Sequence, residues 1–129
     1  MFESESEERW ISTVNADPEF QLAGRWTDVG LDIRCGTQTV HYRIAEGRLD
    51  AQGPSGDDRV VVLEGSDSAW ADFLAPVPLP KNHHVLAMDR HRADFTIASG
   101  RHWLIQNLRV IDLVLQLLRR PSTSRREES

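Results

Sequence analysis

The chain has 129 residues, of which 40% are hydrophobic and 27% charged, and its formal net charge is -5. This length and balance fit one globular domain and exclude both a pair of ordinary domains and a disordered chain. The negative charge argues against nucleic acid as a partner, because phosphate binding requires a concentrated basic surface. No apolar run in the sequence approaches the roughly 18 residues of a transmembrane segment.

The cysteine count indicates the redox compartment, and the two ends of the sequence set the expected domain limits. Cys35 is the single cysteine, which excludes an intrachain disulfide and favours the reducing cytoplasm. Residues 1–8 are acidic and lack the apolar stretch of a signal peptide, so we expect a flexible N-terminus. Residues 9–120 should form the domain. Residues 121–129 should be a disordered tail, because Pro121 is expected to end the preceding helix.

The first half of the chain reads as a helix followed by strands. Residues 5–15 place Trp10, Ile11 and Val14 on one side of a helix. The apolar period then changes to two, and a nearly all-apolar run follows a loop at residues 53–58. These patterns predict strands over residues 20–24, 31–35, 40–44, 49–51 and 60–63, with a turn at residues 28–30.

The second half is mostly helical. Ser66 or Asp67 can cap a helix that ends near residue 75, and the prolines at 76, 78 and 80 require an extended connection. A short helix beginning at Asn82, a strand over residues 95–98 and a last helix over residues 101–120 follow. A block of strands with helices gathered after it is typical of the α+β class. We therefore predict a mostly antiparallel sheet covered on one face by helices.

The last helix is more apolar than a surface helix needs. Its polar positions, Arg109, Asp112, Gln116, Arg119 and Arg120, fall on one narrow stripe. One apolar side must cover the sheet, and the other requires a second partner. That partner can be another helix of this chain, another subunit or a bound apolar ligand. For a homodimer or a partner enzyme, the predicted contact residues are Val110, Val114 and Leu117.

Several segments resemble the sterol carrier protein type-2-like family of lipid-binding domains. The run from Phe20 to Trp26 leads into Leu31-Asp32-Ile33 and is similar to the first strands of that family. The segments that match its later strands, turns and closing helix are Val40 to Leu49, Val60 to Ser66 with Trp70 and Phe73-Leu74, and Phe95-Thr96-Ile97. One departure is the segment Ala98-Ser99-Gly100, where the family often has an acidic residue followed by glycine.

The resemblance implies a five-stranded, mostly antiparallel sheet covered on one face by helices, with an apolar tunnel between the two layers. Its ligands would be sterols, fatty acids or acyl-CoA-like lipids. Such a site requires only a dry concave space with a few placed polar groups. Ordinary core packing is the alternative for every position that the resemblance implies as lining. Those positions are Leu31, Ile33, Val40, Tyr42, Ile44, Trp70, Phe73, Leu74, Phe95, Ile97, Leu104, Leu108, Ile111 and Leu115.

No catalytic, metal or cofactor motif is present in the sequence, so no catalytic residue, metal or cofactor is predicted. The five histidines lack the close spacing of a metal site. Cys35 is expected to be a small buried side chain. Tyr42 is the one polar-tipped residue expected inside, so its hydroxyl either anchors a ligand or bonds a neighbouring group.

Three functions remain open after these exclusions. The first is a carrier of an apolar ligand, and the second is a helper subunit that docks on an enzyme or on itself. The third is an enzyme acting on an apolar substrate, with Tyr42, His84 and Asp89 near the rim of the pocket.

Overall fold

One five-stranded mixed sheet organises the fold. The computed structural model describes residues 4–51, 59–75 and 84–127. The strand order is β3-β2-β1-β4-β5, in which β1 and β4 are parallel and the other neighbours are antiparallel. This agrees with the predicted sheet. The strands are β1 (Asp28–Cys35), β2 (Gln38–Ala45), β3 (Arg48–Ala51), β4 (Val60–Gly65) and β5 (Phe95–Ser99).

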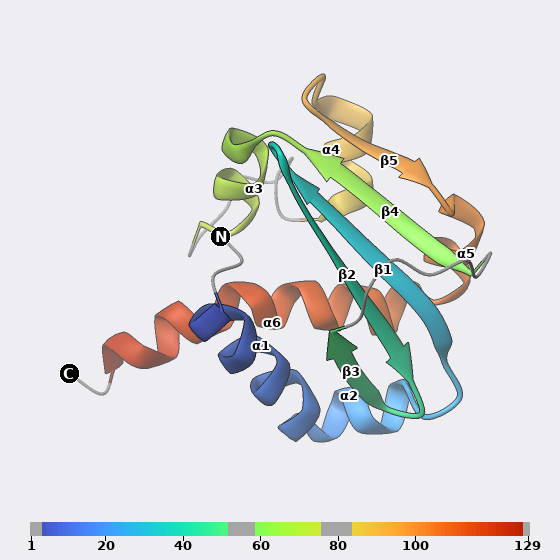
Figure 1. Ribbon diagram of the computed structural model, residues 1–129, viewed down its shortest axis with the longest axis vertical. Helices are drawn as coiled ribbons and strands as arrows, with labels where there is room; N and C mark the ends of the chain where they lie inside the picture. Colours follow the sequence, from blue (N-terminus) through green and yellow to red (C-terminus); the bar gives the residue numbers. More distant parts are fainter. Residues whose placement is uncertain (1–3, 52–58, 76–83, 128–129) are drawn as a thin grey trace.

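Helices cover one face of this sheet, and Figure 1 looks onto the opposite, open face, with β1 and β2 passing in front of α6. The predicted α+β class is therefore confirmed. In the part of the chain that the structure describes, no helix is both long and apolar enough to cross a lipid bilayer. The helices are α1 (Ser4–Ala16), α2 (Pro18–Ala23), α3 (Asp67–Phe73), α4 (Val85–His91), α5 (Arg101–Gln106) and α6 (Leu108–Glu127).

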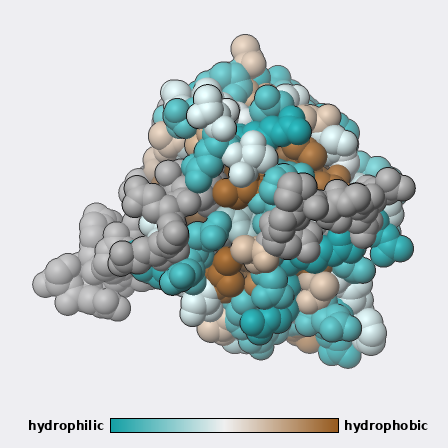
Figure 2. Space-filling model, in the orientation of Figure 1, coloured by the Kyte–Doolittle hydropathy of each residue, from teal (hydrophilic) through white to brown (hydrophobic). Residues whose placement is uncertain are grey.

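The register of β1 and β2 confirms the alternation expected from the sequence. Leu31 lies opposite Tyr42 and Ile33 opposite Val40, all on the covered face. The intervening positions, such as Asp32 opposite His41, lie on the open face. Hydrophilic residues predominate among the coloured residues of that face in Figure 2. Because side chains alternate along a strand, this one register separates the core face of the sheet from its solvent-exposed face.

The second apolar partner of α6 comes from the same chain. Trp10 and Val14 of α1 and Phe20 of α2 are buried in one cluster with the inner side of α6 and the sheet. The Trp10 indole also donates a hydrogen bond to the Val114 carbonyl oxygen at 2.9 Å. Val110, Val114 and Leu117 are consequently all buried within the chain. The predicted subunit contact through Val114 and Leu117 is therefore wrong, while Val110 also borders a surface hollow.

A short helix replaces the first predicted strand. Asp17 caps α2 by accepting the Phe20 N–H at 2.9 Å, and Pro18 occupies the first turn, where a missing N–H costs nothing. Only Phe20 then points into the core, while Leu22 is exposed. The alternation of Phe20, Leu22 and Gly24 suggested a period of two. The Asp17 cap and Pro18 instead begin a helix directly after α1.

The predicted last helix is broken at Asn107. The Asn107 backbone and side-chain N–H groups both donate to the Trp103 carbonyl oxygen, which ends α5. Gly100 precedes α5 with a φ of 78°, and a Cβ there would lie 2.0 Å from the Val60 carbonyl oxygen. Glycine is therefore required at this turn. It accounts for the Ala98-Ser99-Gly100 departure noted above.

The remaining differences concern element ends. Most of the acidic N-terminal segment is helical, because α1 begins at Ser4, and α6 continues past Pro121 to Glu127. Residues 28–30, expected to form a turn, begin β1 because Asp28, Val29 and Gly30 each pair with β2. The predicted loop at 53–58, the proline connection at 76–80 and the Asn82 cap lie outside the described residues.

Asn15 of α1 completes the edge of the sheet at β3. Its amide nitrogen donates to the Leu49 carbonyl oxygen at 2.9 Å, and its carbonyl oxygen accepts the Leu49 N–H at 2.7 Å. A side-chain amide thus takes the place of a neighbouring strand. An edge strand otherwise presents unpaired backbone groups.

We expect the Asn15→Ala variant to lose about 2 kcal/mol of unfolding free energy, because both backbone groups of the buried Leu49 lose their partner. Denaturant unfolding followed by circular dichroism measures this loss. The exposed Ser12→Ala variant on the same helix is the control and should remain within about 0.5 kcal/mol of the parent. An Asn15→Ala variant as stable as this control would contradict the role of the amide.

Candidate binding surface

The fourteen predicted lining residues lie together in the layer between the sheet and the helices. Eleven of them are buried, and Val40, Leu74 and Leu108 are partly buried against the same cluster. The sequence therefore predicted which side chains meet, but their contact with a ligand remains a prediction. None of the fourteen lines either of two surface hollows that described residues form.

Tyr42 is held by its own chain. Its hydroxyl donates to Glu7 Oε2 at 2.6 Å, and its ring meets that of Trp10 edge to face with centroids 4.9 Å apart. Burial and then the hydrogen bond to Glu7 raise the pKa of Tyr42 far above its usual value, so the phenol stays protonated. Of the two roles considered for this hydroxyl, the structure gives the bond to a neighbouring group.

Cys35 behaves as a buried thiol. Its Sγ donates to Asp67 Oδ1 at 3.3 Å, and burial followed by this hydrogen bond raises the pKa of Cys35 to about 11. Only a thiolate is a strong nucleophile, so this side chain is unreactive near neutral pH. The expected role as a small core residue is confirmed.

The groups considered for an enzyme are each held by a structural partner. His84 Nδ1 accepts the Leu86 N–H as the cap of α4, and its Nε2 lies 3.5 Å from Asp112 Oδ1. Burial would raise the pKa of Asp89, but hydrogen bonds from the Ile97 N–H and from Arg101 lower it below its usual value. Together with the Tyr42–Glu7 bond, these contacts tie the three candidate groups to three separate parts of the fold.

The other histidines that the structure describes form no cluster with metal-ligating residues. His41 Nδ1 lies 2.9 Å from Asp32 Oδ1 on the open face, which is an ion pair when the imidazole is protonated. His91 and His102 are exposed, and His83 lies outside the described residues. Within the described ranges, no group of three or more histidine, cysteine, aspartate or glutamate side chains could hold a metal ion.

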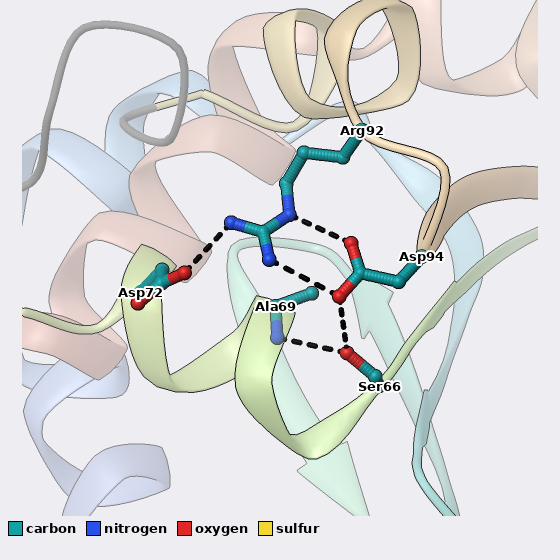
Figure 3. A network of polar contacts seen from close by, with 5 residues as sticks. All are labelled: Ser66, Ala69, Asp72, Arg92 and Asp94. Carbon is teal, nitrogen blue, oxygen red and sulfur yellow. Dashed lines mark hydrogen bonds and ion pairs between the residues drawn. The ribbon is translucent and has the colours of Figure 1, made fainter.

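A network around Arg92 joins α3 to the start of β5 (Figure 3). Arg92 donates from Nε and Nη2 to the two oxygens of Asp94, and from Nη1 to Asp72 at 2.8 Å. Ser66 donates to Asp94 at 2.6 Å and accepts the Ala69 N–H, which caps α3. Because the carboxylates face donors of their own chain, we interpret this network as structural.

A hollow of about 360 Å³ lies between α2 and the junction of α5 and α6. In Figure 1, α2 lies at the bottom of the view and α5 at its right. The ion pair between Glu19 and Arg109 connects its two sides. The lining is mixed, with apolar and polar side chains: Glu19, Leu22, Ala23, Thr27, Gln106, Asn107, Arg109 and Val110. A second hollow of about 290 Å³ is formed by α4 and the preceding His84.

Three large apolar side chains among the described residues are exposed, and each stands at or next to a hollow-lining position in the sequence. Trp26 is 85% exposed, Leu22 67% and Ile105 52%. Leu22 lines the hollow, while Trp26 and Ile105 each directly precede a lining residue. We call the hollow and these three side chains the α2–α5 surface. An exposed apolar group of this kind marks interaction sites more often than isolated surface residues do.

Sequence reasoning missed the α2–α5 surface for an identifiable reason. A strand over residues 20–24 would bury Leu22, and an unbroken helix over residues 101–120 does not single out Ile105. In the sequence, Trp26 stands out only as part of the segment that resembles the sterol carrier family. The Asp17-Pro18 pair, a helix-start signal, could have corrected the first interpretation.

Comparison with known proteins gives no further identification. No family model, curated protein or solved structure matches this chain. The resemblance to the sterol carrier family therefore stays a prediction. The fold and the candidate surface define the chain as an α+β domain with one apolar core and an exposed apolar surface at one end.

The Arg92 network makes stability depend on pH. Arg92 and then Ser66 hold the pKa of Asp94 well below its usual value near 4. A lowered folded-state pKa adds stability above that value, and this stability is lost as the pH falls toward the folded-state pKa. We expect the difference in melting temperature between the parent and Asp94→Asn to be constant from about pH 5 to 8 and to shrink below about pH 4.

Circular dichroism melts across this pH range measure the difference. In an Arg92→Ala background, the same substitution should lose most of its pH dependence. An Asp94→Asn effect that grows as the pH falls would show that the sign is wrong.

Proposed function

We propose that this chain is a non-catalytic binding domain that receives an apolar group of another molecule at the α2–α5 surface. The observation that carries the proposal is a hollow of about 360 Å³ that the exposed Leu22 lines, with the exposed Trp26 and Ile105 each next in sequence to a lining residue. Leaving large apolar side chains in water forfeits about 25 cal/mol for each Å² that could be buried. Covering these three side chains therefore stabilises a complex.

The lining of the hollow supports binding of an apolar group with a polar edge. Leu22, Ala23 and Val110 supply apolar wall, and Thr27, Gln106 and Asn107 supply groups that form hydrogen bonds. Small-molecule sites commonly combine apolar walls with a few polar groups, and their volumes begin near 300 Å³. The hollow is at the small end of that range, which suits one ring system or one branched side chain.

The titratable groups support a binding role over an enzymatic one. Tyr42 and Cys35 have raised pKa values and stay protonated, and each donates its hydrogen to a carboxylate. A general base or nucleophile needs a pKa near the working pH or an adjacent activating group. Neither residue meets that requirement.

A second candidate site is the layer between the sheet and the helices, which the resemblance to the sterol carrier family suggests for a lipid. It is favoured by the presence of all fourteen predicted residues in one apolar cluster. A ligand there would have to displace packed side chains, whereas the hollow at the α2–α5 surface is already open. We therefore rank the α2–α5 surface first.

Titration of the isotope-labelled protein with indole, followed by amide chemical shifts, tests the proposal. We expect saturable shifts at Leu22, Ala23, Asn107 and Val110. The exposed Gln106 lines the hollow, so Gln106→Phe should fill it and weaken indole binding about tenfold or more. Ser68→Phe, at an exposed position of α3, is the control and should leave binding unchanged.

The pattern of shifts separates the possible outcomes. Shifts centred on Leu31, Tyr42 and Leu104 would transfer the site to the sheet–helix layer. The absence of saturable shifts at either place would refute an apolar binding site.

The second candidate has its own test in Leu108, which is partly buried against the core. If a lipid occupies the layer, Leu108→Trp should fill ligand volume and strongly reduce binding of a fluorescent fatty acid. If Leu108 is ordinary packing, the parent binds no fatty acid, and the variant is destabilised by about 1–3 kcal/mol. Fluorescence titration and denaturant unfolding of the same two proteins distinguish these results.

A further inference from the structure

We infer that the hollow of the α2–α5 surface takes an uncharged ring that carries an N–H donor next to a C=O acceptor, as a cyclic amide does. This inference rests on the proposed function, because it names the class of ligand for the same site. Its basis is that three uncharged polar side chains, Thr27, Gln106 and Asn107, line the hollow. Each of them keeps hydrogen-bonding groups that the described part of the chain does not use.

Thr27 is the buried member of this set, with 7% of its surface exposed. Its backbone N–H and carbonyl oxygen are bonded to Gly24 and Glu46, but no described residue forms a hydrogen bond with its hydroxyl. The hydroxyl is not sealed in the core either, because His41 Nδ1 is the one fully buried side-chain polar atom that lacks a hydrogen bond among the described residues. The Thr27 hydroxyl therefore stays in contact with solvent, and the hollow that Thr27 lines provides that contact.

Asn107 presents an acceptor, and Gln106 presents a second amide. Asn107 Nδ2 donates to the Trp103 carbonyl oxygen at 3.0 Å, and because that oxygen can only accept, the contact fixes which end of the amide is the nitrogen. Asn107 Oδ1 is left without a hydrogen-bond partner among the described residues. The exposed Gln106 adds one group that donates and one that accepts. The hollow thus offers both kinds of hydrogen bond to a single ligand.

The charged groups of the hollow favour a neutral ligand. Glu19 and Arg109 are the two charged side chains that line it, and they form an ion pair with each other. An anion or a cation would therefore compete with this pair for its counter-charge. A neutral ring needs no counter-charge, and its polar edge loses little free energy on leaving water when each group finds a partner.

A ring with a donor and an acceptor on one edge suits this arrangement better than a purely apolar ring. Leu22, Ala23 and Val110 give the faces of the ring an apolar wall. In the bound state, the Thr27 hydroxyl donates to the C=O of the ligand and Asn107 Oδ1 accepts its N–H. A site built around such groups rejects an analogue that lacks one of them, because a polar side chain of the site then stays unpaired.

A matched pair of probes is 2-pyridone, a cyclic amide, and 2-pyrone, in which a ring oxygen replaces the N–H and the shape is kept. Titration of the isotope-labelled full chain with each probe, followed by amide chemical shifts, measures the two dissociation constants. We expect 2-pyridone to cause saturable shifts at Leu22, Thr27 and Asn107. The dissociation constant of 2-pyrone should be higher by about tenfold or more.

Thr27→Val removes the hydroxyl and nearly keeps the size of the side chain. It should raise the dissociation constant of 2-pyridone about tenfold. Because the hydroxyl bonds nothing in the described part of the chain, the variant should fold, which circular dichroism checks. Thr39→Val, at an exposed position of β2, is the matched control and should leave the affinity unchanged.

Equal affinities of the parent chain for 2-pyridone and 2-pyrone overturn the inference, and so does an unchanged affinity of Thr27→Val for 2-pyridone. Benzoate or benzylamine that binds more tightly than 2-pyridone has the same meaning, because the ligand is then an ion. The proposed function fails separately: a hollow that binds indole without distinguishing the two probes keeps the apolar site and loses only the cyclic amide as its ligand class. A hollow that binds none of these compounds loses both.

Discussion

The fold depends on covering α6 from two sides. Over residues 108–118 most of its surface is apolar, so the sheet alone would leave one apolar side of α6 in water. Trp10 supplies the second cover, since its ring meets Tyr42 of the sheet and its indole N–H donates to the Val114 carbonyl oxygen of α6. One side chain of α1 therefore contacts both the sheet and α6. The apolar excess of α6, which could have indicated a ligand or a subunit, is largely accounted for by this packing.

That constraint also determines where another molecule can bind. The covered face of the sheet is used by the core, and the open face carries charged groups in pairs, such as Arg34 with Glu64 and His41 with Asp32. Paired surface charges offer little net attraction to a partner. The α2–α5 surface differs from both faces, because its exposed side chains are large and apolar. Location and chemistry together make it the candidate for recognition.

Much of the fold could be predicted from the sequence, because the spacing of apolar residues along a strand or helix is a local pattern. The positions of Leu31, Ile33, Tyr42 and Ile44 follow from a period of two, and the pairing of β1 with β2 confirms them. The α2–α5 surface could not be predicted from the sequence. It depends on where α2 lies relative to the α5–α6 junction, because residues of both line the hollow only through tertiary packing. The break at Asn107 has no strong sequence signal, because asparagine is also tolerated inside helices.

The contact between Trp10 and Val114 joins residues 104 positions apart in the chain. A ribosome delivers α1 long before α6, so the growing chain must carry the apolar side of α1 and the inner face of the sheet uncovered until synthesis is nearly complete. Such long-range closure slows folding, because the entropy of a large loop is lost before the contact is gained. The nascent chain is therefore expected to depend on chaperones more than its modest length suggests.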